Sequence, residues 1–188
     1  FTATIDPSGT KKNFSCGWFV AEVSLTSGIN TIEYYVNEKA TSGGKYSCLF
    51  DCMVLAPSIY DWTTPTLNTR PKYTTMQFDE DGVAWIEEND CDTYSNSADG
   101  VLSTRVGTNG TAQETADMMS GGDAYWAWWG GTTYDATYKV NAPEAGTYKL
   151  WYRGSDPTGA YHDKSRITVN GTEVTVTKVE GTSFTATI

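Results

Sequence analysis

The segment Thr133-Tyr-Asp-Ala-Thr-Tyr-Lys-Val-Asn-Ala-Pro-Glu-Ala-Gly-Thr-Tyr-Lys-Leu-Trp-Tyr-Arg153 contains the clearest pair of predicted β-strands in the chain. Residues 133–140 and 146–153 are rich in Tyr, Thr, Val and Trp, which are residue types enriched in strands. The connection between them contains a proline and leads into a glycine, both of which mark turns. The segment therefore predicts two consecutive strands joined by a short turn.

Similar strand patterns lie on both sides of this pair. The further predicted strands cover residues 14–23, 29–36, 46–55, 75–78, 83–87, 124–129, 166–169 and 173–179. Residues 91–120 are small and polar, and we expect a long loop there with at most one edge strand. No long stretch has the helical period of 3.6 residues. Many short strands at this spacing predict an all-β chain folded as a jelly-roll β-sandwich.

The two ends of the chain carry the same five residues. Phe1-Thr-Ala-Thr-Ile5 recurs as Phe184-Thr-Ala-Thr-Ile188, and the alternation of apolar residues with Thr predicts a half-buried strand. The match indicates either a window cut from a tandem array of repeats or a permuted or strand-swapped chain that contains one strand twice. In both cases the strand links one unit to the next. An overlap without biological meaning is the third explanation.

The charge of the chain excludes two classes of partner. The 188 residues carry a formal net charge of −10, whereas nucleic acids and anionic membrane surfaces attract patches of Lys and Arg. No apolar run approaches the roughly 18 residues that span a bilayer, so we expect no membrane insertion. The N-terminus lacks the pattern of a signal peptide, and we therefore expect a mature chain or a fragment.

The cysteines and the glycosylation sequons favour a secreted protein. The four cysteines are Cys16, Cys48, Cys52 and Cys91. They form only one loose pair at the C-x₃-C spacing, and the chain has one histidine, so two disulfides are expected rather than a zinc site. Three N-x-S/T sequons begin at Asn13, Asn109 and Asn170. An extracellular or cell-surface location is the expectation.

Several segments resemble a known family of sugar-binding modules. They are Ile86–Asn89, Ser120–Tyr125, Tyr138–Arg153, Val169–Gly171, Val23–Ile32 and Leu49–Pro57. Taken from Val83 to Ile188 and then from Asp6 to Pro57, their order resembles that of the carbohydrate-binding modules of families 6 and 35. Those modules are galactose-binding-like β-sandwiches, so the resemblance implies the same fold for this chain in a circularly permuted order.

The resemblance also implies a division of the chain. Residues 1–57 match the C-terminal half of a module, residues 58–82 form a linker or extension, and residues 83–188 match the N-terminal half. The second half belongs either to the next repeat or to the same module in permuted order. A sandwich with this order is completed by permutation, by swapping or by a neighbouring unit.

A cluster of aromatic residues is the first candidate for ligand binding. Tyr125-Trp126-Ala-Trp128-Trp129 offers rings on which a sugar can stack. Strand alternation places Trp126 and Trp128 on one face and Tyr125 and Trp129 on the other, so at least one pair belongs to the core. Packing in the core is the more common fate of such a pair, and a sugar platform is the functional alternative.

The family resemblance implies further residues for this candidate cleft and shows that one ligand-binding residue of the family is missing. In the family an aromatic residue from a loop lines the cleft, and the matching positions here are Phe14 or Trp18. The family also has an asparagine two residues before an aspartate of the last strand. That aspartate matches Asp51, but Leu49 stands at the asparagine position and cannot hydrogen-bond a hydroxyl. The resemblance therefore implies an incomplete sugar cleft.

The resemblance implies a structural calcium between the first and last strands of the module. Asp51 and Glu88 match ligand positions, and Glu87 replaces a missing ligand only if the strand register shifts. A solvated acidic rim is the alternative interpretation. Because these two strands are neighbours in the family, the resemblance also implies a disulfide between Cys52 and Cys91. The two cysteines that are left, Cys16 and Cys48, would then form the second disulfide.

The sequence gives little support for catalysis. His162 lies in a polar turn region, no G-x-S-x-G motif is present, and a surface histidine is expected. We therefore predict a non-enzymatic structural repeat of an extracellular filament or cell-surface fibre, with copies of itself as partners. The alternative is a carbohydrate-binding module of a secreted enzyme or adhesin, with glycans as partners.

Overall fold

The computed structural model describes residues 2–5, 16–59, 76–80, 82–88, 90–96, 125–130, 133–160, 162–179 and 184–187. For strand residues 2–5, 16, 49, 93–96, 125–130, 155 and 184–187 only the backbone is described. These residues form fourteen β-strands and no helix, which confirms the predicted all-β class. None of the described residues forms a helix with the length and hydropathy needed to cross a bilayer.

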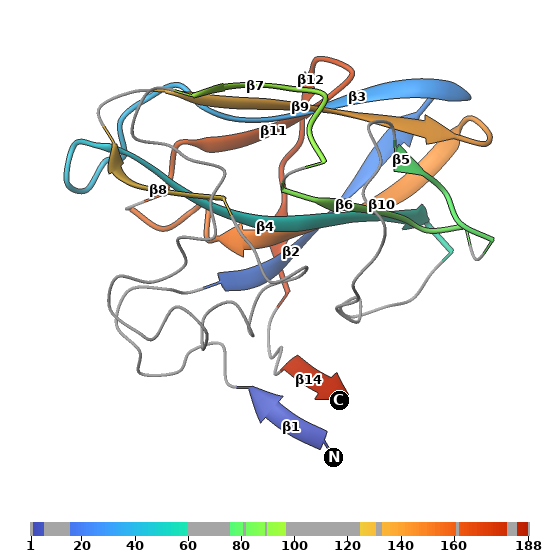
Figure 1. Ribbon diagram of the computed structural model, residues 1–188, viewed down its shortest axis with the longest axis horizontal. Helices are drawn as coiled ribbons and strands as arrows, with labels where there is room; N and C mark the ends of the chain where they lie inside the picture. The colour runs from blue at the N-terminus through green and yellow to red at the C-terminus, as the bar shows by residue number, and fades with distance from the viewer. Residues whose placement is uncertain are drawn as a thin grey trace.

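All strands except β1 (Thr2–Ile5) and β14 (Phe184–Thr187) form two six-stranded sheets that pack face to face (Figure 1). The first, called the β10 sheet, has the order β13 (Thr177–Lys178), β2 (Cys16–Leu25), β10 (Gly146–Ser155), β4 (Tyr46–Pro57) and β6 (Ala84–Glu87). On the edge of β4 that pairs with β6, the first half of β4 pairs with β8 (Tyr125–Gly130). All of these pairs are antiparallel.

The second sheet, called the β3 sheet, also has six strands. Its order is β12 (Thr172–Glu173), β11 (Ser165–Val169), β3 (Gly28–Val36), β9 (Tyr134–Ala142) and β5 (Met76–Gln77). β7 (Thr93–Asn96) pairs with the first half of β9, and β5 joins the second half in parallel. Together the two sheets confirm the predicted β-sandwich.

In both sheets, strands from before residue 58 lie between strands from after residue 83. β3 lies between β11 and β9, and β4 lies between β10 and β6. The two parts of the chain therefore build one sandwich together. The pairing of β4 with β6 also makes neighbours of the two strands that the family resemblance treats as last and first. The permuted order and the division into modules stay predictions.

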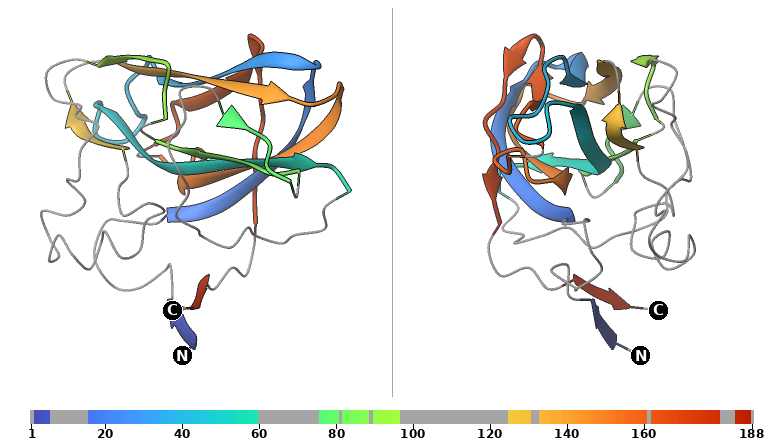
Figure 2. Two further views of the ribbon diagram at one scale, coloured as in Figure 1. Left: turned by 45° about the vertical axis from the view of Figure 1, so that its right-hand side comes forward. Right: turned by 90° about the vertical axis from the view of Figure 1, so that its left-hand side faces the viewer.

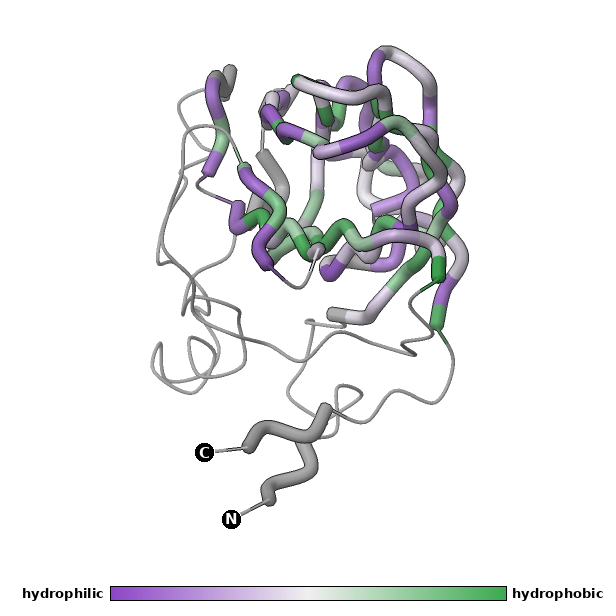
Figure 3. Tube along the Cα trace, turned by 90° about the vertical axis from the view of Figure 1, so that its right-hand side faces the viewer, coloured by the Kyte–Doolittle hydropathy of each residue, from purple (hydrophilic) through white to green (hydrophobic). Residues whose placement is uncertain are grey.

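The space between the sheets is filled mainly by aromatic and branched aliphatic side chains. Tyr34 lies at its centre, where its ring stacks on Phe50 and Tyr152 with centroid distances of 4.9 and 5.7 Å. Leu150 and Ile32 are fully buried in the same cluster. Figure 3 shows green, apolar positions recurring along strands of both sheets. Burial of these side chains supplies the main favourable term of folding.

The β10 sheet buries side chains on its outer face as well. A second apolar cluster there consists of Trp18, Cys52, Val54, Ala56, Val83, Trp85 and Trp151. Because both faces are covered, five consecutive residues from Cys52 to Ala56 have no exposed surface. A strand that is buried on both faces is apolar throughout instead of alternating.

The two copies of the terminal pentapeptide pair with each other. β1 (Thr2–Ile5) and β14 (Phe184–Thr187) form a two-stranded antiparallel sheet with Ala3 opposite Ala186. Figures 1 and 2 show this sheet outside the sandwich, at the point where both termini lie. Both segments therefore have the backbone of a strand, while the predicted half-burial of their side chains lies outside the described residues. Phe1 and Ile188 lie outside the described residues.

The structure corrects the expected Cys52–Cys91 disulfide. No disulfide joins the cysteines whose side chains are described, which are Cys48, Cys52 and Cys91. Cys52 belongs to the cluster on the outer face of the β10 sheet, whereas Cys91 packs against the core between the sheets. The two thiols therefore belong to different apolar clusters. The side chain of Cys16 lies outside the described residues.

Candidate functional site

A β-bulge in β4 creates the most unusual group of buried side chains. Arg153 of β10 lies opposite Cys52, but Gly154 lies opposite Phe50, so Asp51 is one extra residue on β4. Phe50 and Met53 both point into the core between the sheets. The bulge therefore turns Asp51 and Cys52 together toward the outer face, where a regular strand would show only one of them.

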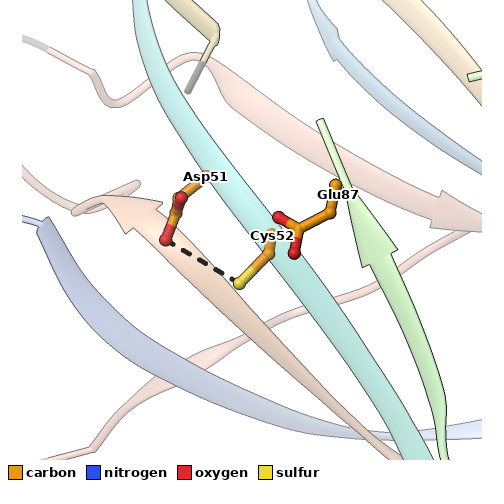
Figure 4. Close-up of side chains that lie close together, drawn as sticks. All are labelled: Asp51, Cys52 and Glu87. Atoms are coloured by element: carbon orange, nitrogen blue, oxygen red, sulfur yellow. Dashed lines mark hydrogen bonds between the residues drawn. The ribbon is translucent and has the colours of Figure 1, made fainter. Parts of the chain in front are cut away.

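The strand register then brings a second carboxylate to the same place. Cys52 lies directly opposite Glu87 of β6, and Arg153 lies opposite Cys52 on the other side. Figure 4 shows Asp51 and Cys52 on β4 with the Glu87 carboxylate reaching toward them from β6. One ligand atom from each of these three side chains lies within 4.8 Å of the others. All three residues are buried.

Protein donors already hold both carboxylates in place. The Arg153 guanidinium donates to Asp51 Oδ2, and the Cys52 thiol lies 3.8 Å from the same oxygen. Trp85 Nε1 donates to Glu87 Oε1 at 2.6 Å. These contacts fix the side chains in an apolar surrounding, where a carboxylate without partners would be strongly destabilised.

Two further acidic residues are buried next to this group. The backbone N–H of Glu88 donates to the Asp51 carbonyl at 3.2 Å, and that of Glu87 donates to Asp90 Oδ2 at 2.8 Å. Glu88 and Asp90 are both buried. Glu88 and Asp90 thus adjoin Asp51 and Glu87 through hydrogen bonds that involve the backbone.

The donor set suits a divalent cation only in part. Calcium takes six to eight oxygen ligands, and Asp51 and Glu87 supply carboxylate oxygens from adjacent strands. The Cys52 sulfur is a ligand that zinc prefers. Of the predicted calcium ligands, the structure brings Asp51 and Glu87 together, while Glu88 is buried beside them. The sequence predicted Cys52 as a disulfide cysteine and not as a metal ligand. Its position opposite Glu87 depends on the register between two strands that lie far apart in the chain.

The predicted sugar platform is not assembled from the described side chains. Trp18 has no exposed surface and packs in the outer cluster of the β10 sheet, so its ring offers no face to a ligand here. The backbone of β8 places Trp126 opposite Leu49 and Tyr125 opposite Phe50. The side chains of Tyr125, Trp126 and Trp128 and all of Phe14 lie outside the described residues.

Asn170 is the one predicted sequon asparagine among the described residues. It lies with Gly171 in the turn between β11 and β12, where both residues have positive φ. Its Oδ1 accepts the backbone N–H of Thr31 at 2.9 Å, and its Nδ2 donates to Asn30 Oδ1 at 2.8 Å. The amide therefore ties the β11–β12 turn to β3. Asn13 and Asn109 lie outside the described residues.

His162 is more enclosed than a surface histidine. Its Nδ1 forms a hydrogen bond with Ser47 Oγ at 3.1 Å, which joins the start of β4 to the loop before β11. Burial lowers the pKa of His162, and this outweighs the opposing effects of Ser47, Asp156 and Asp163. The Asp163 carboxylate accepts hydrogen bonds from the backbone N–H and the hydroxyl of Thr41.

Comparisons with family models, with curated proteins and with solved structures find no match to this chain. The likeness to the carbohydrate-binding modules of families 6 and 35 therefore stays a prediction.

Proposed function

We propose that the chain is a non-catalytic structural repeat of an extracellular filament or cell-surface fibre, in which units are joined through the terminal Phe-Thr-Ala-Thr-Ile strands. The observation that carries this proposal is the pairing of β1 with β14. Two identical segments from opposite ends of the chain meet in a sheet of their own, separate from the two sheets of the sandwich.

The register of this pair makes the strand self-complementary. Ala3 lies opposite Ala186, and Thr2 and Thr4 lie opposite Thr187 and Thr185. Because the two segments are identical, the third position pairs with the third and the second pairs with the fourth. The same segment of another copy can therefore replace either strand and form the same backbone pairs.

The energetics permit exchange between copies. A two-stranded antiparallel sheet is marginally stable by itself, so little free energy is lost when it opens. Its outer edges also carry backbone groups that another strand can pair with. Closure within one chain competes with pairing between chains, and the balance shifts toward assembly as the concentration rises. In a covalent tandem array, the same pairing would join consecutive repeats.

The test is the size distribution of the purified chain as a function of concentration. We expect a concentration-dependent series of oligomers in analytical ultracentrifugation. The double variant Ala3→Pro/Ala186→Pro removes a backbone N–H from each strand and should remain monomeric. The matched control Ala3→Val/Ala186→Val keeps the strand propensity and should assemble like the parent chain. A parent chain that stays monomeric at every concentration, or a proline variant that assembles equally well, contradicts the proposal.

A carbohydrate-binding module is the second candidate function. The observation in its favour is the position of β8, whose aromatic-rich segment pairs with β4 beside the family's cleft position at Leu49. Sedimentation with insoluble polysaccharides tests this candidate. Binding that is lost in Trp126→Ala and Trp128→Ala, while the oligomeric state is unchanged, would support it over the array.

A structural divalent cation at Asp51, Cys52 and Glu87 is a further part of the proposal. It would join β4 to β6 through buried side chains of the two adjacent strands. Such an ion stabilises the sandwich and takes no part in chemistry.

A further inference from the structure

The turn between β11 and β12 contains a chemically labile pair of residues, Asn170 and Gly171. Both residues are exposed and have positive φ. Glycine has no side chain to shield its backbone nitrogen, so this nitrogen can approach the side-chain amide of a preceding asparagine more closely than that of any other residue. An asparagine followed by glycine is therefore the one most readily lost by deamidation.

The reaction requires no reagent except water. The backbone nitrogen of Gly171 attacks Cγ of Asn170 and forms a new C–N bond, its proton passes to solvent, and Nδ2 leaves as ammonia. Water then opens the resulting succinimide ring at one of its two carbonyl carbons. The product is aspartate or, when the peptide bond runs through the side chain, isoaspartate.

The native hydrogen bonds of Asn170 oppose this reaction. Its Oδ1 accepts the backbone N–H of Thr31 at 2.9 Å, and its Nδ2 donates to Asn30 Oδ1 at 2.8 Å. Attack makes Cγ tetrahedral and expels Nδ2, so both side-chain hydrogen bonds have to be released. The turn must therefore separate from β3 before the reaction can proceed.

Asn30 offers only a hydrogen-bond acceptor to position 170. It is fully buried, and its Nδ2 donates to the carbonyls of Thr26 and Gly28 at 2.7 and 2.9 Å. Its Oδ1 also accepts the backbone N–H of Thr26 at 2.9 Å. Reversal of the Asn30 amide would lose these bonds, so the orientation of the amide is fixed. A carboxylate at position 170 would place an oxygen against Asn30 Oδ1 without a proton between them.

From these contacts we propose that Asn170 is a deamidation site that the fold protects. It converts to aspartate or isoaspartate only when the β11–β12 turn opens, and the product cannot restore the hydrogen bond to Asn30. Each opening that leads to reaction therefore leaves the turn permanently less well attached to β3. The inference uses no residue of β1, β14 or the Asp51 group, so it is independent of the proposed assembly and cation site.

The test compares the loss of Asn170 in folded chain and in chain unfolded by urea, both at pH 8 and both free of N-glycans. Peptide mapping by mass spectrometry follows each asparagine. In urea, Asn170 and Asn109 should convert at similar rates, because both stand in the sequence Asn-Gly-Thr. In native buffer, Asn170 should convert at least about tenfold more slowly than in urea, since two hydrogen bonds have to open. Equal rates in the two buffers, or no conversion in urea, would overturn the inference.

A variant of Asn30 tests the source of the protection. Asn30→Ala removes the acceptor of Asn170 Nδ2 and should raise the rate of conversion in the folded chain by about tenfold. The control Asn141→Ala removes a side-chain hydrogen bond to Gln77 and should leave the rate unchanged.

The parent chain in low concentrations of urea replaces this variant if Asn30→Ala does not fold. Below the unfolding transition, the rate of conversion of Asn170 should rise in parallel with the hydrogen exchange of the Thr31 amide. A rate that does not follow this exchange contradicts the role given to the turn.

Asn170→Asp represents one product of the reaction and tests its consequence. It should lower the midpoint of urea unfolding at neutral pH, because the carboxylate cannot donate to Asn30. The control Asn37→Asp adds the same charge at another exposed position and should leave the midpoint nearly unchanged. If the two variants unfold at the same urea concentration, position 170 does not distinguish an amide from a carboxylate and this part of the inference is wrong.

Discussion

Arg153 and Asp51 form an ion pair in the outer apolar cluster of the β10 sheet, where their side chains are only 2% and 0% exposed. Opposite charges in such a place attract strongly, but both have also lost their hydration. The pair therefore affects stability mainly through the free energy that is lost when one partner is removed. Removal of one partner leaves the other charged group buried among Trp18, Cys52 and Trp151.

We predict that Arg153→Met lowers the free energy of unfolding by about 3–5 kcal/mol, because it leaves the Asp51 carboxylate without its counter-charge. The measurement is urea unfolding at neutral pH. The double variant Arg153→Met/Asp51→Leu should recover most of the loss.

The partly exposed pair of Lys139 and Asp92 provides the control. Lys139→Met should cost less than about 1 kcal/mol, since solvent screens that pair. Equal losses in Arg153→Met and Lys139→Met would contradict the role given to burial.

The buried carboxylates predict a response to divalent cations. An ion that binds Asp51 and Glu87 only in the folded chain stabilises it by about 2.7 kcal/mol at a free concentration one hundred times its Kd. We therefore expect calcium or zinc to raise the midpoint of thermal unfolding after treatment with a chelator. The rise should disappear in Glu87→Gln.

Cys52→Ser distinguishes the two metals. It replaces sulfur by oxygen, so it should weaken the effect of zinc while leaving that of calcium in place. Glu22→Gln on the exposed side of β2 serves as the control. If neither ion shifts the midpoint of the parent chain, the proposed cation site is wrong.

The strands could be predicted because their signal is local. Runs such as residues 133–140 and 146–153 contain strand-forming residues between clear turn residues, and β9 and β10 lie there within two residues at each end. The short strand Thr93–Asn96 was expected only as an edge strand in a long loop. The predicted strand 173–179 is divided into β12 and β13, because the chain changes sheets between them.

The arrangement of the candidate site depends on pairing between distant strands. A single extra residue at Asp51 changes which side of β4 the following residues face, and no local pattern marks that bulge. Cys52 lies in the outer cluster whereas Cys91 packs against the core between the sheets, and no disulfide joins them. The family resemblance implies Trp18 as an aromatic residue of the sugar cleft, yet its side chain is buried in the cluster on the outer face of the β10 sheet.

The lowered pKa of His162 predicts a loss of stability in mild acid. Burial disfavours the imidazolium form, so the folded chain binds a proton less readily than the unfolded chain, whose histidine has an ordinary pKa of about 6.5. The stabilising effect is complete above that value and is lost as the pH falls below it toward the lower pKa of the folded state. Asp156 and Asp163 nearby oppose the shift without cancelling it.

The measurement is urea unfolding at pH 8, 7, 6 and 5 for the parent chain and for His162→Gln. Glutamine retains a hydrogen-bonding group for Ser47 but has no charge to gain. The parent chain should lose more stability than the variant between pH 7 and pH 5. Parallel curves for the two proteins would show that His162 does not titrate differently in the two states.

The turn between β11 and β12 predicts a position that requires glycine. Asn170 and Gly171 have φ values of 50° and 76°, which is the left-handed region that asparagine tolerates and that glycine enters without strain. A Cβ at Gly171 would meet no atom within 4 Å, so the cost of Gly171→Ala is conformational and not steric. We expect it to lower the free energy of unfolding by about 1 kcal/mol. Gly146→Ala at the start of β10, where the added Cβ makes an ordinary 3.8 Å contact with Tyr148, should be close to neutral. If the two variants unfold at the same urea concentration, the turn tolerates other residues and its pairing with β3 through Asn170 does not depend on this geometry.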